Sequence, residues 1–300
     1  MIEPAPRREP GAVTPLTRFV TRHPVGAFSV TAFGLGWPLL FVHSTTSFAS
    51  TAVGLAFTWG ALLGSALAVT WVCGGAPAVR RLLARLVQWR FGLGRWAYVV
   101  LALPALTVTT AALSGTLVLP SGGWAALVTG YLLQTFVYGA AEVNVAEEGA
   151  WSGLVQTRLA ERHGVLGGAL RTAPLFVAMH VPLQFTPGWT WGEVGIGLAV
   201  LAVVAPFFRY LLGETLQATG GSVLAAGVLH AAFNASGQLG FPGGWQFLPA
   251  LVVLAVGVGL LQRLRGPHPH DAGGPEPATA LSVPGEPVLE LRDGDGDDEH

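Results

Sequence analysis

A polytopic bundle of about eight transmembrane helices is the all-α fold that this sequence predicts. Charged residues make up only 11% of the 300-residue chain, hydrophobic residues make up 51%, and the mean hydropathy is +0.54. A soluble domain usually carries about a quarter charged residues, and a shortfall of this size is too large to come from a hydrophobic core. The apolar residues also fall in runs of about 17 to 25, which is the length that crosses a bilayer as a helix.

Eight apolar segments along the chain are the predicted spans. The fifth segment is short for a span, so we expect it to be longer, tilted or partly shielded by its neighbours. The segments are Val25–His43, Thr51–Cys73, Trp96–Leu119, Trp124–Glu142, Thr172–Phe185, Val194–Tyr210, Ser222–Leu239 and Phe247–Leu261.

The distribution of basic residues predicts the orientation of these spans. The chain has no Lys, and its Arg residues precede the first span, follow the last and occupy alternate connections, with Arg209 placed at the end of the sixth span. The other connections, residues 43–50, 120–123, 184–192 and 240–246, contain no Arg. Cytoplasmic loops carry the excess of basic residues, so this pattern predicts a multi-pass cell-membrane protein with both termini in the cytoplasm. The high Ala, Gly and Arg content favours a bacterial plasma membrane.

Polar residues inside the apolar runs are the candidates for function. No acidic residue occurs in residues 10–141, and the adjacent Glu147 and Glu148 then follow at the predicted cytoplasmic end of the fourth span. His180 and His230 lie well inside the fifth and seventh spans. A titratable side chain in a bilayer is costly unless it faces a polar cavity or a partner, so each of these residues is a functional candidate.

The depths of the two histidines predict that they meet. If their spans enter the membrane near Thr172 and Gly221, His180 and His230 lie roughly 12 to 13 Å inside it from the cytoplasmic side. The fourth span ends on that side with its glutamates. Three helices are therefore predicted to bring two imidazoles and a carboxylate to one shared cavity.

The local spacing of the candidate residues predicts which of them share a helix face and which point apart. Glu147 and Glu148 point about 100° apart around a helix, so one is predicted to address water or substrate while the other holds a neighbouring group. His230 and Asn234 are four residues apart and share one helix face. Taken singly, Glu147 can be an interfacial carboxylate paired with Arg, His180 a packing histidine and Asn234 a contact between helices. The joint pattern favours a site over these separate interpretations.

Three short motifs resemble those of the CPBP intramembrane metalloproteases, a family that includes type 2 CAAX prenyl proteases and bacterial proteins similar to lysostaphin resistance protein A. The motifs are EEGAWSG, FVAMH and HAAFN, and the resemblance covers about residues 125–240. The residues that match the three motifs in order are Glu147 and Glu148, Phe176 and His180, and His230 and Asn234.

One position departs from the family pattern. Ser152 stands where the first motif has Arg, although Gly153 beside it fits. Arg158 cannot replace that side chain, because it lies about 15 Å further along a helix. Activity is therefore predicted to be altered or lost through Ser152, and Ser152→Arg is predicted to relieve such a deficit.

The resemblance implies an intramembrane endopeptidase. In one version Glu147 is the general base, His180 orients and polarises the attacking water, and His230 and Asn234 donate to the oxyanion. In a second version a divalent metal, zinc by its ligand types, binds Glu147, His180 and His230, and the other carboxylate acts as base. Glu147, Glu148, His180, His230 and Asn234 are thus the predicted catalytic residues, and the choice between the two versions stays open.

Two other functions remain open at this point. A catalytically inactive membrane scaffold of the same fold is one, and a proton-coupled transporter is the other, although the halves of the chain show no repeat. The expected partners are the lipid bilayer and a membrane-associated peptide or protein, with no nucleic acid. The predicted parts are residues 1–24, a cytoplasmic segment; 25–124, N-terminal spans; 125–240, the CAAX protease-like core; 241–265, the last span; and 266–300, a disordered acidic tail.

Overall fold

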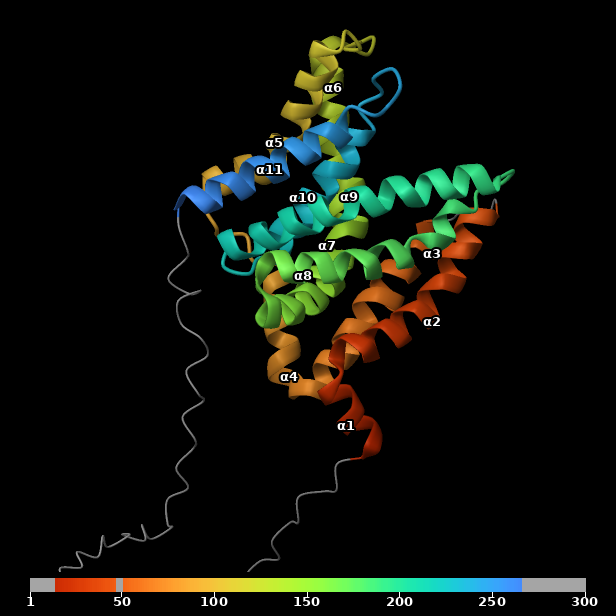
Figure 1. Ribbon diagram of the computed structural model, residues 1–300, viewed down its shortest axis with the longest axis vertical. Helices are drawn as coiled ribbons and strands as arrows, with labels where there is room; N and C mark the ends of the chain where they lie inside the picture. Colours follow the sequence, from red (N-terminus) through yellow and green to blue (C-terminus); the bar gives the residue numbers. More distant parts are fainter. Residues whose placement is uncertain (1–13, 47–50, 266–300) are drawn as a thin grey trace, which may run out of the picture. The chain divides into compact units, whose positions relative to one another are not determined.

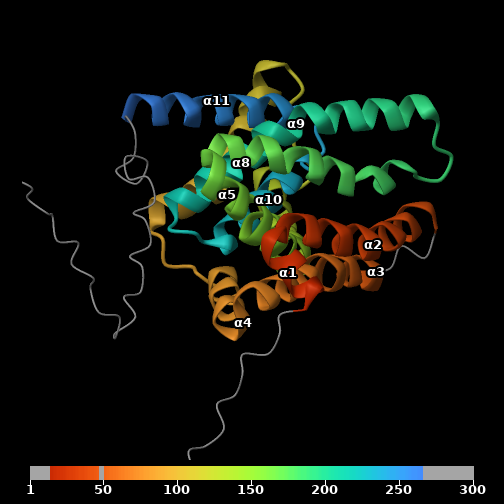
Figure 2. The ribbon, with the colours of Figure 1, turned by 60° about the horizontal axis from the view of Figure 1, so that its bottom comes forward.

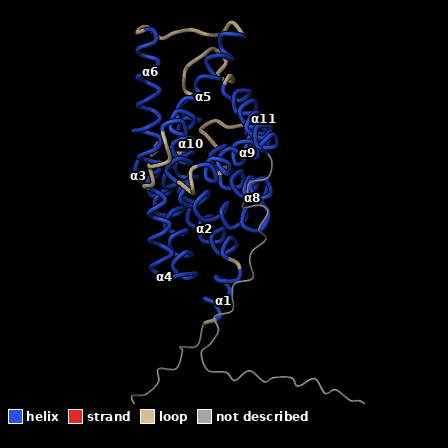
Figure 3. The backbone as a smooth tube through the Cα atoms, turned by 90° about the vertical axis from the view of Figure 1, so that its left-hand side faces the viewer, coloured by secondary structure: helices blue, strands red, loops and turns tan. Residues whose placement is uncertain are grey.

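The computed structural model describes residues 14–46 and 51–265, and every regular element within these ranges is a helix (Figure 3). The predicted acidic tail, 266–300, lies outside the described residues. The helices (Figure 1) are α1 Pro15–Arg22, α2 Pro24–Thr45, α3 Thr51–Leu55, η1 Ala56–Gly64, α4 Ser65–Leu86, α5 Leu93–Leu113, α6 Gly123–Leu133, η2 Gln134–Asn144, α7 Val145–Ala150, η3 Trp151–Gln156, α8 Thr157–Met179, η4 Val181–Gln184, α9 Trp191–Ala218, α10 Val223–Gly237 and α11 Phe247–Arg265.

The predicted all-α polytopic fold is confirmed. Five helices of the described chain are long and apolar enough to cross a membrane, namely Pro24–Thr45, Thr51–Leu86, Leu93–Leu113, Trp191–Ala218 and Phe247–Leu264. The predicted fourth, fifth and seventh spans also fall on helices, but these are interrupted by π-helical turns or kinks, or are short. The fifth and seventh predicted spans carry His180 and His230, and Glu147 and Glu148 follow the fourth on α7.

The fourth predicted span, Trp124–Glu142, corresponds to α6 and η2, and the helical path continues beyond it through α7 and η3. The π-helical turns of η2 and η3 flank the short α7 on both sides. A π-helical turn is wider than an α-helical one and reorients the side chains that follow it, and such turns are frequent at functional sites. Glu147 and Glu148 lie on α7, between these two wider segments.

The fifth span differs from its predicted bounds at both ends. α8 begins at Thr157, turns at Gly164, where φ is +70°, and ends at Met179, so His180 caps the helix instead of lying within it. Pro182 explains the early end, because a proline has no N–H to offer the carbonyl one turn back. That carbonyl, on Ala178, instead accepts a hydrogen bond from Nε1 of Trp37 on α2 at 3.2 Å.

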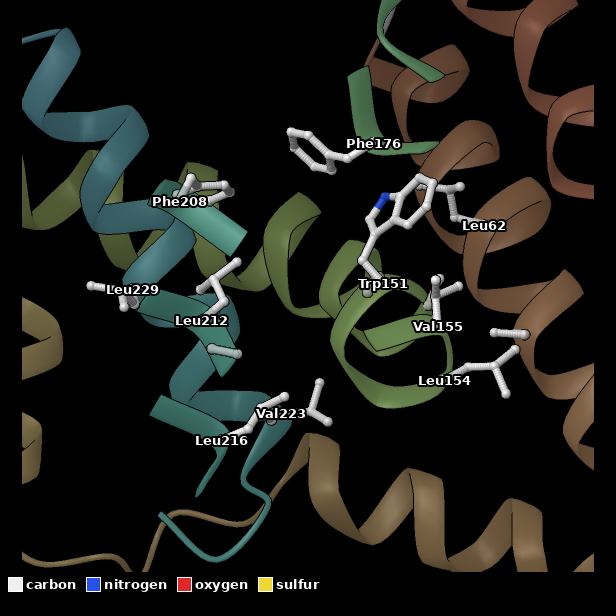
Figure 4. Close-up of a cluster of buried hydrophobic side chains, with 14 of the residues drawn as sticks. Leu62, Trp151, Leu154, Val155, Phe176, Phe208, Leu212, Leu216, Val223 and Leu229 are labelled. Carbon is white, nitrogen blue, oxygen red and sulfur yellow. The ribbon is translucent and has the colours of Figure 1, made fainter. Parts of the chain in front are cut away.

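The buried core packs around η3 and joins the helices that carry the site. α8 and α9 run side by side (Figures 1 and 2), and α10 packs against α5, η2 and α7. A glycine makes the last contact close: a Cβ on Gly227 of α10 would come within 2.7 Å of the Cα of Val145 on α7. Residues of this core drawn in Figure 4 include Leu62, Trp151, Val155, Phe176, Phe208, Leu212, Val223 and Leu229.

Candidate active site

Glu147 and Glu148 are both buried, with 4% and 0% of their surfaces exposed. A buried carboxylate is costly unless it is paired or hydrogen-bonded. Adjacent positions on a helix point apart, and the two side chains accordingly contact different partners. The two glutamates therefore have to be considered as separate halves of the site.

Glu148 is held by partners from three other segments. Nη1 of Arg209 on α9 donates to its Oε1 at 2.9 Å and to its Oε2 at 3.0 Å. Nδ1 of His230 on α10 lies 2.9 Å from Oε1, and the hydroxyl of Ser152 on η3 donates to Oε2. Both carboxylate oxygens are thus occupied, so Glu148 is an anchor for its neighbours.

Arg209 is fully buried, and all three nitrogens of its guanidinium have partners. Nε donates to Oε1 of Gln156 at 2.9 Å, and Nη2 donates to the hydroxyl of Ser152 at 3.0 Å. Gln156 in turn donates through Nε2 to the carbonyl of Arg209 at 2.7 Å. The prediction that Arg209 ends the sixth span is wrong, because α9 continues to Ala218 and this side chain turns into the core.

Glu147 faces His180. Oε1 of Glu147 lies 3.7 Å from Nε2 of His180, and no hydrogen bond from the described residues reaches that oxygen. On the other side of the imidazole, Nδ1 lies 2.7 Å from the carbonyl of Phe176. A carbonyl only accepts, so Nδ1 carries a proton, and Nε2 is the ring nitrogen that faces Glu147.

Aromatic rings pack against both imidazoles of the site. The ring centroid of Phe176 lies 4.2 Å from that of His180 and 6.1 Å from that of His230. Phe208 on α9 packs edge-on against His230, with centroids 4.8 Å apart. These rings restrict both imidazoles and exclude water from their flanks, and an apolar surround strengthens the electrostatic interactions inside it.

Asn234 lies one turn beyond His230 on α10, as its spacing predicts, but it is exposed. Its Nδ2 lies 3.5 Å from Oδ1 of the buried Asn144 on η2, at the long limit of a hydrogen bond. No contact with either glutamate is recorded for it. Its predicted role as an oxyanion donor therefore stays a prediction.

The metal version of the site has little support from this arrangement. Among residues 14–46 and 51–265, no three His, Cys, Asp or Glu side chains converge as a group that holds a metal ion. Glu148 contacts Nδ1 of His230 at 2.9 Å, and Glu147 lies 3.7 Å from Nε2 of His180. Zinc on Glu147, His180 and His230 stays a prediction, and no step below is derived through a metal.

The sequence interpretation missed three members of the site: Arg209, Ser152 as a hydrogen-bonding partner, and Gln156. A signal for Arg209 was present, because it stands between apolar residues in the run PFFRYLL. A cation with apolar neighbours on both sides is a candidate for a buried partner to an acid. The acid that it meets is 61 positions away in the chain, a pairing that spacing does not predict.

The order of these residues along the chain agrees with a family comparison. Residues 130–236 match the family model described as type II CAAX prenyl endopeptidase Rce1-like. This segment is similar to that family, and the match covers less than half of the 300-residue chain. The matched range contains both glutamates, both histidines and Asn234, and also Ser152 and Arg209. No curated protein matches the chain.

Proposed function

We propose that this CAAX protease-like protein is an intramembrane endopeptidase in which Glu147 and His180 activate a water molecule. The observation that carries the proposal is the contrast between the two glutamates. Arg209, His230 and Ser152 occupy the carboxylate of Glu148, whereas Oε1 of Glu147 faces Nε2 of His180 at 3.7 Å. Glu147 is thus the carboxylate with capacity to accept a proton.

The geometry of this pair suits a bridging water. An ionised carboxylate and Nε2 of a neutral imidazole are both acceptors, so they do not bond to each other. One water can donate a hydrogen to each of them across 3.7 Å. Its lone pairs then point away from both groups, toward the carbonyl carbon of a bound peptide. Glu147 takes one proton as the water attacks and later returns it to the departing amine.

His230 is the proposed donor to the oxyanion. Its Nδ1 faces the carboxylate of Glu148 at 2.9 Å, and this nitrogen carries a proton because the carboxylate only accepts. When the ring is an imidazolium, Nε2 also carries a proton and donates to the oxyanion, and the carboxylate of Glu148 balances the positive charge. The arrangement resembles the role of the acid in a Ser–His–Asp triad, which orients a histidine and stabilises its cation. We propose Asn234, one turn further on α10, as the second donor.

A matched pair of glutamine variants tests the proposal. The purified protein in lipid vesicles is incubated with a library of membrane-associated peptides, and the products are identified by mass spectrometry. Glu147→Gln keeps size and hydrogen bonding but removes the base, so cleavage is expected to fall by about a hundredfold or more. Glu142→Gln, a carboxylate on η2 outside the site, is the control and is expected to cleave as the wild type does.

Two outcomes would overturn this proposal. Full cleavage by Glu147→Gln on a verified substrate would end the role of Glu147 as base. Absence of cleavage by the folded wild type across the library would favour a membrane scaffold of the same fold. The substrate class proposed is a membrane-associated peptide or protein, and prenylation of that substrate is not part of the proposal.

A further inference from the structure

The strongest feature outside the water-activating pair is the buried arginine of α9. The resemblance to the family implies an Arg four residues after the second glutamate of the first motif, and Ser152 occupies that position here. The guanidinium of Arg209 reaches the same place from another helix, with Nη2 3.0 Å from the Ser152 hydroxyl. The small side chain of Ser152 leaves room for this cation, and its hydroxyl bonds to it.

The surroundings of Arg209 are built to hold it. Gln156, one turn after Ser152, accepts from Nε at 2.9 Å and donates back to the Arg209 carbonyl at 2.7 Å. Gly213, one turn after Arg209 on α9, keeps this pair close, since a Cβ there would lie 2.5 Å from Nε2 of Gln156. A substitution at any of these positions would disturb the guanidinium.

The carboxylate of Glu148 connects Arg209 to His230. Its Oε1 contacts Nη1 of Arg209 and Nδ1 of His230, each at 2.9 Å. Because the guanidinium fixes the plane of the carboxylate, it also fixes the direction from which the imidazole is held. A group that acts through another in this way is a positioning residue.

We propose that Arg209 replaces, from α9, the arginine missing from the first motif, and that it positions His230 through Glu148. This inference rests on the proposed function for its catalytic consequence. The structural part of the inference does not depend on activity: Arg209 on α9 pairs with Glu148 in place of an arginine at position 152. The departure at Ser152 and the buried Arg209 are therefore one feature and not two.

Moving the arginine from position 209 to position 152 tests the proposal in the full chain. Arg209→Ser removes the cation, Ser152→Arg adds a second guanidinium beside the first, and the double variant Ser152→Arg/Arg209→Ser moves the cation back to the motif position. Arg85→Ser is the matched control. Arg85 also contacts this stretch, donating to the Gly153 carbonyl at 3.2 Å, but its recorded bonds do not include Glu148.

Two measurements are made on each variant that elutes as a folded species in detergent. The first is kcat on a verified peptide, and the second is the ¹⁵N spectrum of the histidine side chains, with His230 assigned from His230→Gln. Arg209→Ser is expected to lower kcat by roughly a hundredfold with little change in KM, as a displaced catalytic group does. It should also shift the His230 nitrogen signals, while Arg85→Ser changes neither measurement.

The double variant decides the spatial claim. We expect it to recover the His230 signals and to raise kcat at least about tenfold above that of Arg209→Ser. The motif alone predicts that Ser152→Arg relieves a deficit, but beside Arg209 we expect this single variant to lose both the His230 signals and kcat, because two buried guanidinium groups repel. If Arg209→Ser does not fold, Arg209→Lys replaces it. The kcat of Arg209→Lys is expected to lie between the wild-type value and the roughly hundredfold reduction given for Arg209→Ser, since an ammonium lacks the planar fork of a guanidinium.

The outcomes separate the two proposals. Unchanged kcat and unchanged His230 signals in folded Arg209→Ser overturn the positioning role while the peptidase proposal stands. A folded double variant that recovers neither measurement overturns the replacement of one arginine by the other. A wild type that cleaves nothing, with His230 signals lost in Arg209→Ser and recovered in the double variant, supports the positioning role and removes the peptidase proposal.

Discussion

Nη1 of Arg209 lies 2.9 Å from one carboxylate oxygen of Glu148 and 3.0 Å from the other, and both side chains are fully buried. This ion pair ties α9 to α7 across the core of the site. Removing one partner of a buried pair leaves an uncompensated charge, which costs more than removing both. The pair also leaves Glu147 as the glutamate that is available for chemistry.

We expect Glu148→Gln to destabilise the protein strongly. The glutamine keeps the shape of the side chain but leaves the Arg209 cation buried without its counter-ion, at a cost of about 3–5 kcal/mol in the free energy of unfolding. Denaturant unfolding of the detergent-solubilised protein, followed by tryptophan fluorescence, measures this loss. The double variant Glu148→Gln/Arg209→Met is expected to be more stable than Glu148→Gln alone.

The control for this measurement is Glu142→Gln, which changes a partly exposed carboxylate on η2. Surface substitutions of this kind usually change stability by no more than about 0.5 kcal/mol. Equal unfolding of Glu142→Gln and Glu148→Gln would show that the Arg209 cation does not depend on Glu148.

Gly227→Ala is expected to separate α10 from α7. The added Cβ would meet the Cα of Val145 at 2.7 Å, and a backbone atom cannot move aside as a flexible side chain does. Overpacking of this kind costs about 1–3 kcal/mol, and the shift would lengthen the contact between His230 and Glu148. Thermal unfolding and cleavage rate should both fall.

Gly130→Ala on α6 is the matched helix-glycine control, because a Cβ there meets nothing within 4 Å. Alanine is the better helix former by about 0.8–1.0 kcal/mol, so this variant should be as stable as the wild type or more stable. Wild-type stability and activity in Gly227→Ala would contradict the close packing of α7 and α10.

Asn234→Ala should affect catalysis more than folding. If its amide donates to the oxyanion, its loss adds roughly 2–4 kcal/mol to the barrier, measured as a fall in kcat. The unfolding transition should hardly change, since the side chain is exposed and water can solvate what remains. Asn144→Ala removes only the partner of Asn234, so kcat in that variant should fall less. An equal fall in both would assign the effect to the Asn144–Asn234 contact.

The orientation in the membrane can be measured by cysteine labelling. Cys73 is the single cysteine, so a Cys73→Ala background removes it. We then expect Val87→Cys, on the loop after α4, to react only after the cells are permeabilised, and Pro187→Cys, before α9, to react with a membrane-impermeant maleimide from outside. Both residues are exposed. The reverse pattern would invert the predicted topology.

The fold, and the choice of Glu147 and His180 as candidate residues, follow from local features of the chain. Runs of apolar residues predict the helices, and Glu147, Glu148, His180 and His230 stand out because a polar side chain is costly in such runs. Glu148 and Glu147 contact different partners, as adjacent positions on a helix predict, and the prediction that one of them addresses water or substrate stays a prediction. The prediction of different partners needed only the 100° step of a helix.

Helix ends were less predictable. The end of α8 depends on Pro182 and on Trp37, which supplies a hydrogen bond from α2 that the sequence does not reveal. α9 extends beyond Tyr210 to Ala218 and its Arg209 is buried, whereas in the sequence alone that arginine resembles a cytoplasmic anchor. In both cases a contact between distant segments decides the outcome.

The sequence by itself therefore determined a helical membrane protein and the titratable residues inside its apolar runs, because burial cost and helix periodicity act locally. Only the tertiary structure decided that Ser152 is matched by Arg209, since that pairing joins positions 57 apart and depends on how α9 packs against η3. In the sequence alone, Ser152 in place of the motif Arg indicates that a cation is missing from the site. In space, a buried carboxylate requires a cation from some direction, and here α9 provides it.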